Sequence, residues 1–336
     1  MKIIVDGFGG DNAPLEILKG CAQAVEELGV EIIVTGDEEK LNACAKENGI
    51  SMRSITVSHA PDVISMEDDP GEIIKSKSGS SMAQALRQLA AGDGEAVVSA
   101  GSTGALVIGS TFLVKRIKGI RRCAIGTVMP SNGKPFMLID SGANAECRPE
   151  MLVQFAVMGS VYMNRVMKVE KPRIGLVNIG TEDTKGDPLR TETYGLLKNT
   201  SLNFIGNVEA REIPFGACDV AVADGFTGNV VLKLTEGLAG AMMQNIKGIF
   251  LKNGLSKLAA LAVKSGLREF KTRMDYTEYG GAPLMGISKP VIKAHGSSNA
   301  KAVKNAIRQA MNLAETGAVD EIAKNLPKTK ESGSKE

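Results

Sequence analysis

Apolar and polar positions along the chain form blocks that predict strands and helices in turn. Short runs rich in Val and Ile predict strands at 2–5, 31–35, 55–58, 95–99, 123–129, 136–140, 173–179, 203–206 and 219–223. Apolar residues at helical spacing predict helices near 14–28, 38–47, 80–91, 103–118, 149–168, 188–198 and 228–250. Pro14 and Asp37 suit helix starts, whereas Gly29, Gly49 and Gly92 suit helix ends. The alternation predicts an α/β fold with three α/β/α layers around a mostly parallel sheet.

Composition supports one large globular unit. The chain has 336 residues, of which 43% are hydrophobic and 23% are charged, so it can bury a sizeable core. No linker-like segment interrupts residues 1–326, which we expect to form a single α/β catalytic domain. The polar tail 327–336 is expected to be disordered. The net charge of +2 and the lack of interleaved basic and aromatic residues argue against nucleic-acid binding.

The chain carries no sign of secretion or of a membrane span. No basic segment followed by an apolar run opens the sequence, and no stretch reaches the roughly 18 apolar residues of a transmembrane helix. The 5 cysteines are widely spaced and never form a CxxC pair, which is typical of reduced thiols in the cytoplasm. Cys147 could be a nucleophile, but a structural cysteine is the favoured interpretation.

Five predicted strands end in turns that are rich in glycine and small polar residues. These turns cover residues 6–11, 99–104, 140–144, 178–183 and 224–229. Glycine lets the backbone approach a ligand closely, and a helix N-terminus offers N–H groups to an anion. The five turns therefore predict one anion site at the carboxyl ends of parallel strands.

Basic residues near these turns indicate a phosphate ligand. Lys185 follows one turn, Lys233 lies one helical turn beyond another, and Lys293 and His295 follow the apolar run PVI. Lysines at helix N-termini suit phosphate, although each could also be a solvated surface residue. His295 could act as a base, as a donor to an oxyanion, or only as a turn residue.

Several common sites are absent or weakly indicated. GFGGDN lacks the third glycine of a dinucleotide fingerprint, and the sequence has no GxxxxGK[ST], HExxH or GxSxG motif. With 2 histidines, a histidine-based metal cage is excluded. Aspartates at strand ends more commonly cap turns than bind cations, so we expect no metal and no cofactor. The carboxylates that leave the cation alternative open are Asp6, Asp11, Asp140, Glu182 and Asp183.

The segment 240–275 is predicted to be an amphipathic helical protrusion. Its apolar positions at helical spacing include Leu255, Leu258, Ala259, Ala262, Val263, Leu267, Phe270 and Met274. Residues 247–273 carry 7 basic side chains and one acidic side chain, a local charge of 7 minus 1, or +6. Such a helix could pack in a dimer, lie on an anionic membrane or bind an acidic protein. The residues assigned to this contact are Lys257, Leu258, Val263, Lys264, Arg268 and Lys271.

Motifs spread over residues 1 to about 315 resemble the PlsX family of phosphate acyltransferases. They are GGDNAP, SAGSTGAL, DSGAN, QFAVMGSVY, NIGTEDTKG, NFIGNVEAR, DGFTGNVVLK, YGGAPLMGI and VIKAHGSS. Two positions depart from the family pattern. The usual DAMGGD is DGFGGD here, and Ser102 replaces an asparagine.

The resemblance implies a homodimeric enzyme whose fold is similar to isocitrate and isopropylmalate dehydrogenases. It implies acyl transfer from long-chain acyl-[acyl-carrier protein] to inorganic phosphate. The acyl phosphate then feeds a membrane acyltransferase that acylates glycerol 3-phosphate in phospholipid synthesis. The expected location is the cytoplasm, with peripheral contact to the inner face of the membrane left open.

Phosphate is already an anion, and a thiolate leaves readily, so orientation and charge stabilisation are the main catalytic needs. We hypothesise that Lys185, Asn229 and His295 are catalytic. The residues expected to bind phosphate or substrate are Gly9, Asp11, Gly101, Ser102, Thr103, Gly104, Asp140, Asn144, Asn178, Asp224, Gly225, Thr227, Gly228, Lys233 and Lys293. Three alternatives remain: a phosphotransacetylase using short acyl-CoA, a metal-dependent hydroxy-acid dehydrogenase, and a non-catalytic membrane-surface scaffold.

Overall fold

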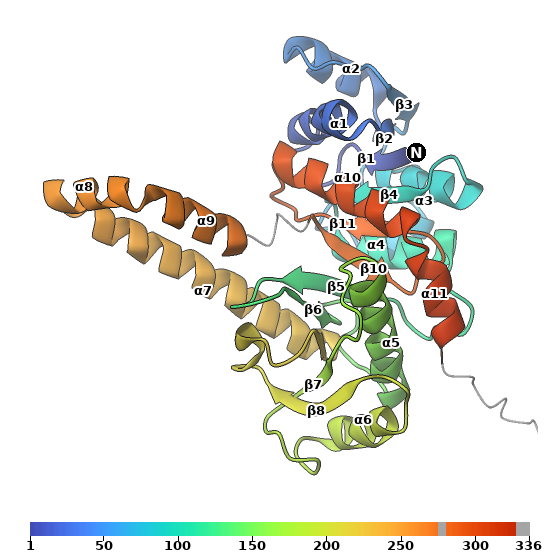
Figure 1. Cartoon of the computed structure of the whole chain (residues 1–336). Helices are drawn as coiled ribbons and strands as arrows, with labels where there is room; N and C mark the ends of the chain where they lie inside the picture. Colours follow the sequence, from blue (N-terminus) through green and yellow to red (C-terminus); the bar gives the residue numbers. More distant parts are fainter. Residues whose placement is uncertain (275–279, 327–336) are drawn as a thin grey trace, which may run out of the picture.

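The computed structural model describes residues 1–274 and 280–326, and its strands form one sheet (Figure 1). The sheet order is β3-β2-β1-β4-β11-β10-β5-β6-β9-β7-β8. The predicted α/β fold with a mostly parallel sheet is confirmed. The strands are β1 (Lys2–Asp6), β2 (Glu31–Gly36), β3 (Ile55–His59), β4 (Ala96–Ser99), β5 (Ala124–Met129), β6 (Phe136–Ile139), β7 (Ile174–Asn178), β8 (Phe204–Glu209), β9 (Val220–Val222), β10 (Ala282–Met285) and β11 (Val291–Lys293).

Helices follow most strands, as the sequence pattern predicts. Asp37 caps its helix by accepting a hydrogen bond from the Lys40 amide, and Gly29 and Gly92 end theirs in left-handed conformations. The α-helices are α1 (Leu15–Leu28), α2 (Glu38–Glu47), α3 (Ser81–Ala91), α4 (Thr103–Gly109), α5 (Pro149–Arg165), α6 (Pro188–Lys198), α7 (Gly225–Leu251), α8 (Gly254–Ala262), α9 (Lys264–Met274), α10 (Ala300–Glu315) and α11 (Ala318–Asn325). Shorter helical turns are η1 (Pro70–Ile74), the π-helical η2 (Ser110–Val114) and η3 (Ile213–Phe215).

Strand direction reverses in the middle of the sheet. β10 pairs antiparallel with β11 and with β5, and β5 pairs antiparallel with β6, whereas all the other pairs are parallel. Consequently β1, β4 and β11 end at the edge opposite to that where β6, β7 and β9 end. The predicted single edge for the five glycine-rich turns is therefore wrong, because the antiparallel strands were not recognised in the sequence. The turns at 6–11, 99–104, 140–144 and 224–229 nevertheless contribute residues to one cleft, as predicted.

The core has a continuous layer on one face of the sheet and two separate clusters on the other. Side chains of α1, α5 and α10 pack with one face, as shown by Leu18, Phe155 and Ile307. On the opposite face, α3 and α4 form one cluster, and α7 contributes to a second cluster with β6 and β9. Neighbouring residues of one strand, such as Ile3 and Ile4, belong to different faces, as strand geometry requires. This gives the three α/β/α layers.

α7, α8 and α9 form an arm that projects from the body of the molecule (Figure 1). α7 begins at Gly225 and runs 27 residues, and α8 and α9 fold back beside it. The expectation of one continuous amphipathic helix within 240–275 is wrong in detail, because Asn253 caps a new helix through a reciprocal bond with Ser256. The predicted protrusion itself is confirmed.

Some sequence predictions missed elements or their ends. The strands β10, of four residues, and β11, of three residues, were not predicted. The helix predicted over 103–118 ends its α-helical part at Gly109 and continues as η2. Among residues 1–274 and 280–326, no helix is long and apolar enough to cross a membrane. The tail 327–336 lies outside the described residues.

Candidate active site

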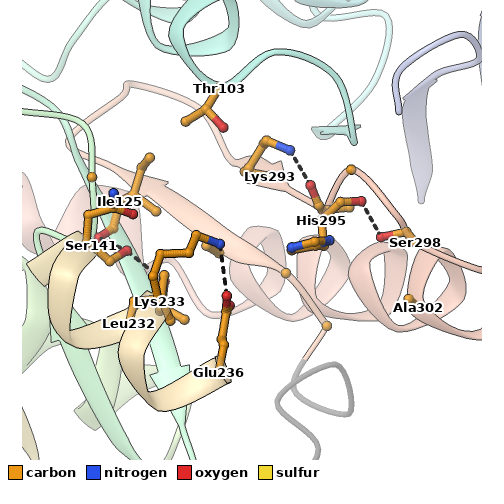
Figure 2. Close-up of a pocket in the computed structure, with 18 of the residues that line it drawn as sticks. Thr103, Ile125, Ser141, Leu232, Lys233, Glu236, Lys293, His295, Ser298 and Ala302 are labelled. Carbon is orange, nitrogen blue, oxygen red and sulfur yellow. Dashed lines mark hydrogen bonds and ion pairs between the residues drawn. The ribbon is translucent and has the colours of Figure 1, made fainter. Parts of the chain in front are cut away.

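A cleft of about 490 Å³ opens between the two apolar clusters on one face of the sheet (Figure 2). Ile125 of one cluster and Leu232 of the other both line it. The cleft forms where strand direction reverses, because turns from both halves of the sheet meet there beside the short middle strands. The lining residues are Asp11, Met66, Thr103, Ile125, Thr127, Val128, Ser141, Gly142, Asn229, Leu232, Lys233, Glu236, Gly280, Gly281, Ala282, Lys293, Ala294, His295, Gly296, Ser298 and Ala302.

Lys293 closes one wall of the cleft at the end of β11. Its ammonium donates to the carbonyl oxygens of Ala100, at 3.2 Å, and of Ala294. Burial lowers the pKa of Lys293 to about 8, the negative charge of Asp6 opposes that shift, and Lys233 adds to it. The side chain is therefore a cation in neutral solution and titrates in mildly alkaline solution.

Asp6 lies buried behind the cleft wall at the end of β1. Its carboxylate accepts hydrogen bonds from the hydroxyls of Ser81, at 2.6 Å, and Ser99, at 2.7 Å. Burial raises the pKa of Asp6, while these hydroxyls and the charge of Lys293 act in the opposite sense. Asp6 is thus an electrostatic partner of Lys293 from behind and does not line the cleft itself.

Lys233 approaches from the opposite wall, on the third turn of α7 (Figure 2). Its ammonium pairs with the Glu236 carboxylate at 2.9 Å. Lys293 from β11 and Lys233 from α7 thus line one cleft, and among residues 1–274 and 280–326 the acidic residues of its lining are Glu236 and Asp11.

The ring of His295 is oriented by its own turn. The Ser297 amide donates to Nδ1 at 3.2 Å, and the Ser297 hydroxyl lies 2.8 Å from the same atom. Because the amide can only donate, Nδ1 is the acceptor, and a neutral ring carries its proton on Nε2. Desolvation in the cleft lowers the pKa of His295; Glu236 opposes this shift, and Lys233 and Lys293 reinforce it. The neutral imidazole can therefore donate a hydrogen bond through Nε2.

The turn after β6 is organised by the buried carboxylate of Asp140. It accepts hydrogen bonds from the amides of Ile125 at 3.0 Å, Ala143 at 3.0 Å and Asn144 at 2.8 Å. The next residue, Ser141, places its hydroxyl 2.7 Å from the Thr127 hydroxyl, and both line the cleft. Asp140 is thus a scaffold for two hydroxyl groups at the cleft wall.

The start of α7 is fixed by Asp224. Its carboxylate accepts from the Thr227 amide at 2.9 Å and from the Thr227 hydroxyl at 2.8 Å, and it also forms an ion pair with Arg190. This N-cap determines where the following turn of the helix places Asn229, which lines the cleft.

Three of the backbone amides of Gly225 to Asn229, the segment predicted to hold phosphate, are occupied within the protein. The Gly225 amide donates to Asn144, the Thr227 amide to the Asp224 side chain, and the Gly228 amide to the Asp224 carbonyl. A phosphate held by these three amides, as predicted, would require those bonds to break. α7 instead contributes Asn229, Leu232, Lys233 and Glu236 to the cleft lining, and of these Asn229 and Lys233 can donate hydrogen bonds to an anion.

In the turns at 6–11 and 99–104, some residues line the cleft and others only support its wall. Asp11 and Thr103 line the cleft, and the Asp11 amide donates to the Gly296 carbonyl at 2.8 Å. Ser102 caps α4 by accepting from the Ala105 amide. The remaining predicted residues of these turns, Gly9, Gly101 and Gly104, pack closely against neighbouring atoms and are outside the lining.

The turn after β7 lies apart from the cleft. Lys185 and Asn178 are not among the lining residues, and Lys185 is exposed. The Asn178 amide donates to the Lys185 carbonyl at 3.0 Å, so the two residues stabilise their own loop. In this conformation, the structure does not bring Lys185 together with Asn229 and His295.

The sequence interpretation missed much of the cleft lining and one ion pair. Thr127, Ser141, Glu236 and Met66 line the cleft, and Arg190 fixes Asp224. Ser141 lies inside the DSGAN turn, which was a usable signal. The others depend on pairing across the sheet or between helices, which the sequence does not reveal.

Metal and thiol chemistry receive little support from the described side chains. Within residues 1–274 and 280–326, no three described His, Cys, Asp or Glu side chains are placed to hold a metal ion. Burial raises the pKa of the Cys147 thiol to about 12, with Asp140 and Asp224 adding to the shift. A thiol with that pKa is a poor nucleophile near neutral pH.

The residues predicted to make carrier-protein or membrane contacts lie on the arm. Leu258 is 64% exposed and Val263 44% exposed, and Lys257, Lys264 and Arg268 are also exposed. The side chain of Lys271 lies outside the described part of α9. The arm therefore presents apolar and basic side chains together.

A family described as fatty acid synthesis proteins matches residues 1–321. The phosphate acyltransferase of Desulfitobacterium hafniense strain Y51 is 47% identical over 329 residues, 98% of each chain. The chain belongs to the phosphate acyltransferase family. The phosphate acyltransferase of Bacillus licheniformis is 49% identical over 315 residues, 93% of this chain and 94% of the relative. The predicted family and enzyme class are confirmed.

Solved structures support the fold of this phosphate acyltransferase family member. A phosphotransacetylase from Streptococcus pyogenes has a TM-score of 0.63 at 18% identity and covers 94% of each chain. A putative 4-hydroxythreonine-4-phosphate dehydrogenase from Salmonella typhimurium has a TM-score of 0.54 at 14% identity, covering 93% of this chain and 99% of that chain. The architecture is thus shared by phosphotransacylases and dehydrogenase-like proteins, as the sequence resemblance implied.

Proposed function

We propose that this enzyme transfers a long-chain acyl group from acyl-[acyl-carrier protein] to inorganic phosphate. The observation that carries the proposal is the pair of lysines, Lys233 and Lys293, on opposite walls of one cleft. Two cations in a partly desolvated cleft suit a phosphate dianion, whereas a site for a neutral substrate would not need them. The family's description as fatty acid synthesis proteins supports a fatty acyl donor.

In the proposed reaction, a phosphate oxygen attacks the thioester carbon. A carbon–oxygen bond forms, the carbonyl becomes a tetrahedral oxyanion, and the carbon–sulfur bond then breaks. The sulfur leaves as a thiolate, which takes a proton from solvent to give the free carrier-protein thiol. Lys233 and Lys293 hold phosphate in position, so the protein contributes mainly orientation and charge stabilisation.

His295 and Asn229 are proposed as donors to the oxyanion. The Nε2 proton of neutral His295 follows from the amide that donates to Nδ1, and Asn229 lines the opposite wall on α7. A donor placed where negative charge develops stabilises the transition state more than the ground state. Thr127 and Ser141 line the same wall, but their hydroxyls bond to each other and Ser141 also donates to the Ile125 carbonyl. Lys185 remains a proposed catalytic residue that would have to reach the cleft by movement of its loop.

The arm is proposed to receive the carrier protein and to approach the membrane. Its basic residues suit an acidic partner protein, and the exposed Leu255, Leu258 and Leu261 suit a lipid surface or a second copy of the chain. We propose a cytoplasmic homodimer that associates peripherally with the membrane. There, acyl phosphate would pass to the acyltransferase that acylates glycerol 3-phosphate in phospholipid synthesis.

The test is incubation of the purified protein with palmitoyl-[acyl-carrier protein] and phosphate. Hydroxylamine traps acyl phosphate, and a thiol reagent follows the released carrier protein. Phosphate-dependent formation of both is expected. Release of thiol without phosphate dependence would instead identify a thioesterase. Equal or faster turnover of acetyl-CoA at the same concentration would favour a phosphotransacetylase, the function named for one structural neighbour.

A further inference from the structure

A second, smaller cavity of about 300 Å³ lies beside the active-site cleft along α7. We propose that this cavity receives the hydrocarbon chain of the acyl donor while the thioester lies in the cleft. The inference rests on the proposed function, because it concerns the chain of that same substrate. Its lining residues are Met129, Pro130, Ser131, Asn132, Phe136, Ala210, Ile213, Pro214, Phe215, Val231, Thr235, Glu236, Ala239 and Phe270.

The two cavities are neighbours, and the same elements line both. Glu236 lines both. On β5, Val128 lines the cleft and the next residue, Met129, lines the second cavity. On α7, Leu232 lines the cleft and the preceding residue, Val231, lines the second cavity. In the proposal, a substrate with its carbonyl near Lys233 extends its chain past Glu236 into the second cavity.

The cavity has an apolar floor and an open aromatic rim. Met129, Phe136 and Ile213 are at most 3% exposed and form the floor. At the rim, Phe215 is 77% exposed and Phe270 is 41% exposed, and Phe270 comes from α9 of the arm. Large aromatic side chains left open to water beside a buried apolar floor indicate a surface that an apolar ligand covers.

The polar groups of the lining are largely occupied within the protein. The Ser131 hydroxyl donates to the Lys134 carbonyl at 2.6 Å, and the Thr235 hydroxyl donates to the Val231 carbonyl at 2.7 Å. Glu236 pairs with Lys233 at the side that faces the cleft. These groups therefore do not need hydrogen bonds from a ligand, so the cavity suits a hydrocarbon chain and not a polar molecule.

The size of the cavity also favours a single flexible chain. About 300 Å³ is at the lower end of the range for small-molecule sites, and a protein segment with its own side chains would need a larger surface. Figure 1 shows the base of α7 beside β6, with the arm leading away from it. An acyl chain delivered at the arm would thus find this cavity on its way to the cleft.

The test compares Ala239→Phe, which fills the cavity from α7, with Ala241→Phe on the same helix. Ala241 is exposed and is not a lining residue. Each variant is assayed with butyryl and palmitoyl thioesters of one carrier protein at saturating phosphate. We expect Ala239→Phe to lower kcat/KM for palmitoyl at least about tenfold relative to butyryl, since it removes space for the distal chain. Ala241→Phe should leave the ratio unchanged.

An unchanged ratio in Ala239→Phe overturns the inference. So does a change in subunit number measured by light scattering, because the cavity would then be an interface between copies. Ala210→Phe, on an exposed turn of the same lining, provides a second variant if Ala239→Phe does not fold. If wild-type protein makes acyl phosphate from neither chain length, the proposed function fails instead, and the two failures remain distinct.

Discussion

A Cβ atom added to Gly228 would lie 1.9 Å from the carbonyl oxygen of Asp140. The first turn of α7 therefore packs directly against the turn that follows β6. At Gly228, only the Cα hydrogens of the glycine fit against the Asp140 carbonyl. This contact holds Asn229 and Ser141 on the same side of the cleft. The glycine allows the close approach on which the cleft wall depends.

Gly228→Ala is expected to destabilise the protein by at least about 3 kcal/mol, because a backbone carbonyl cannot move aside as a flexible side chain can. Activity should fall with it. Gly237→Ala is the matched control, since no atom lies within 4 Å of an added Cβ there. It should stabilise by about 0.5–1 kcal/mol, the usual gain for alanine inside a helix. Urea unfolding midpoints measure both, and equal midpoints would contradict the packing argument.

The phosphate site is expected to weaken in alkaline solution. Lys293 has its pKa lowered to about 8, so it is charged below that pH and loses its proton above it. The KM for phosphate should therefore rise as pH increases through about 8. The charge of Asp6 raises the pKa of Lys293, so Asp6→Asn should move this rise to lower pH.

Lys293→Arg provides the control for this pH profile. Arginine stays protonated across the range, so the alkaline rise in KM should disappear even if the affinity for phosphate changes. An alkaline limb that persists in Lys293→Arg would assign the titration to another group.

Lys293→Ala is expected to lower kcat/KM more than Lys185→Ala does. Loss of one cation at a desolvated phosphate site should lower kcat/KM by about a hundredfold. Loss of an exposed lysine outside the cleft should lower kcat/KM by about tenfold or less. Steady-state kinetics with phosphate as the varied substrate compares them. If Lys185→Ala is equally damaging, the loop after β7 must close over the cleft during turnover.

His295→Ala should lower kcat by about a hundredfold, the usual loss when one oxyanion donor is removed. The KM for phosphate should change little, because the imidazole is proposed to contact the acyl oxyanion and not phosphate. His295→Gln keeps an N–H donor and should recover part of the rate. A large change in phosphate KM with unchanged kcat would move His295 to the phosphate site.

The arm can be tested by three charge changes on its exposed surface. Leu258→Glu should weaken vesicle binding or dimerisation, because it places a charge among exposed apolar residues. Lys264→Glu and Arg268→Glu should raise the KM for the carrier protein, and the effect should shrink as salt increases. Sedimentation with vesicles and carrier-protein kinetics at two ionic strengths provide the measurements. Wild-type behaviour in all three variants would exclude the arm from these contacts.

The local pattern was sufficient for most elements and for much of the site. Alternating blocks predicted most of the strands, and the polar turns at their ends identified Thr103 and Asn229. Lys293 and His295 were identified after the apolar run PVI, and all four residues line the cleft. Cap residues such as Asp37 and Gly92 were predictable because their hydrogen bonds and backbone angles are local. The family resemblance also came from contiguous motifs.

Lys185 is a residue for which the local pattern was not sufficient. It follows a strand end just as the cleft residues do, but β7 is separated from β6 by β9, and its loop bonds to itself. The role of Asp6 as a buried partner of Lys293 was equally hidden, because the two residues are 287 positions apart (293 minus 6) and meet only through the pairing of β4 with β1 and β11.

The sequence by itself determined the elements, the family and the residue types at each turn, because hydrophobic period, caps and glycine turns act over a few neighbouring positions. Only the tertiary structure decided which turns share the cleft. That choice depends on strand order and direction, above all on the short antiparallel β10, which brings Lys293 and Lys233 to opposite walls of one site. Pairings of this kind depend on packing across the whole sheet, and no short stretch of sequence encodes them.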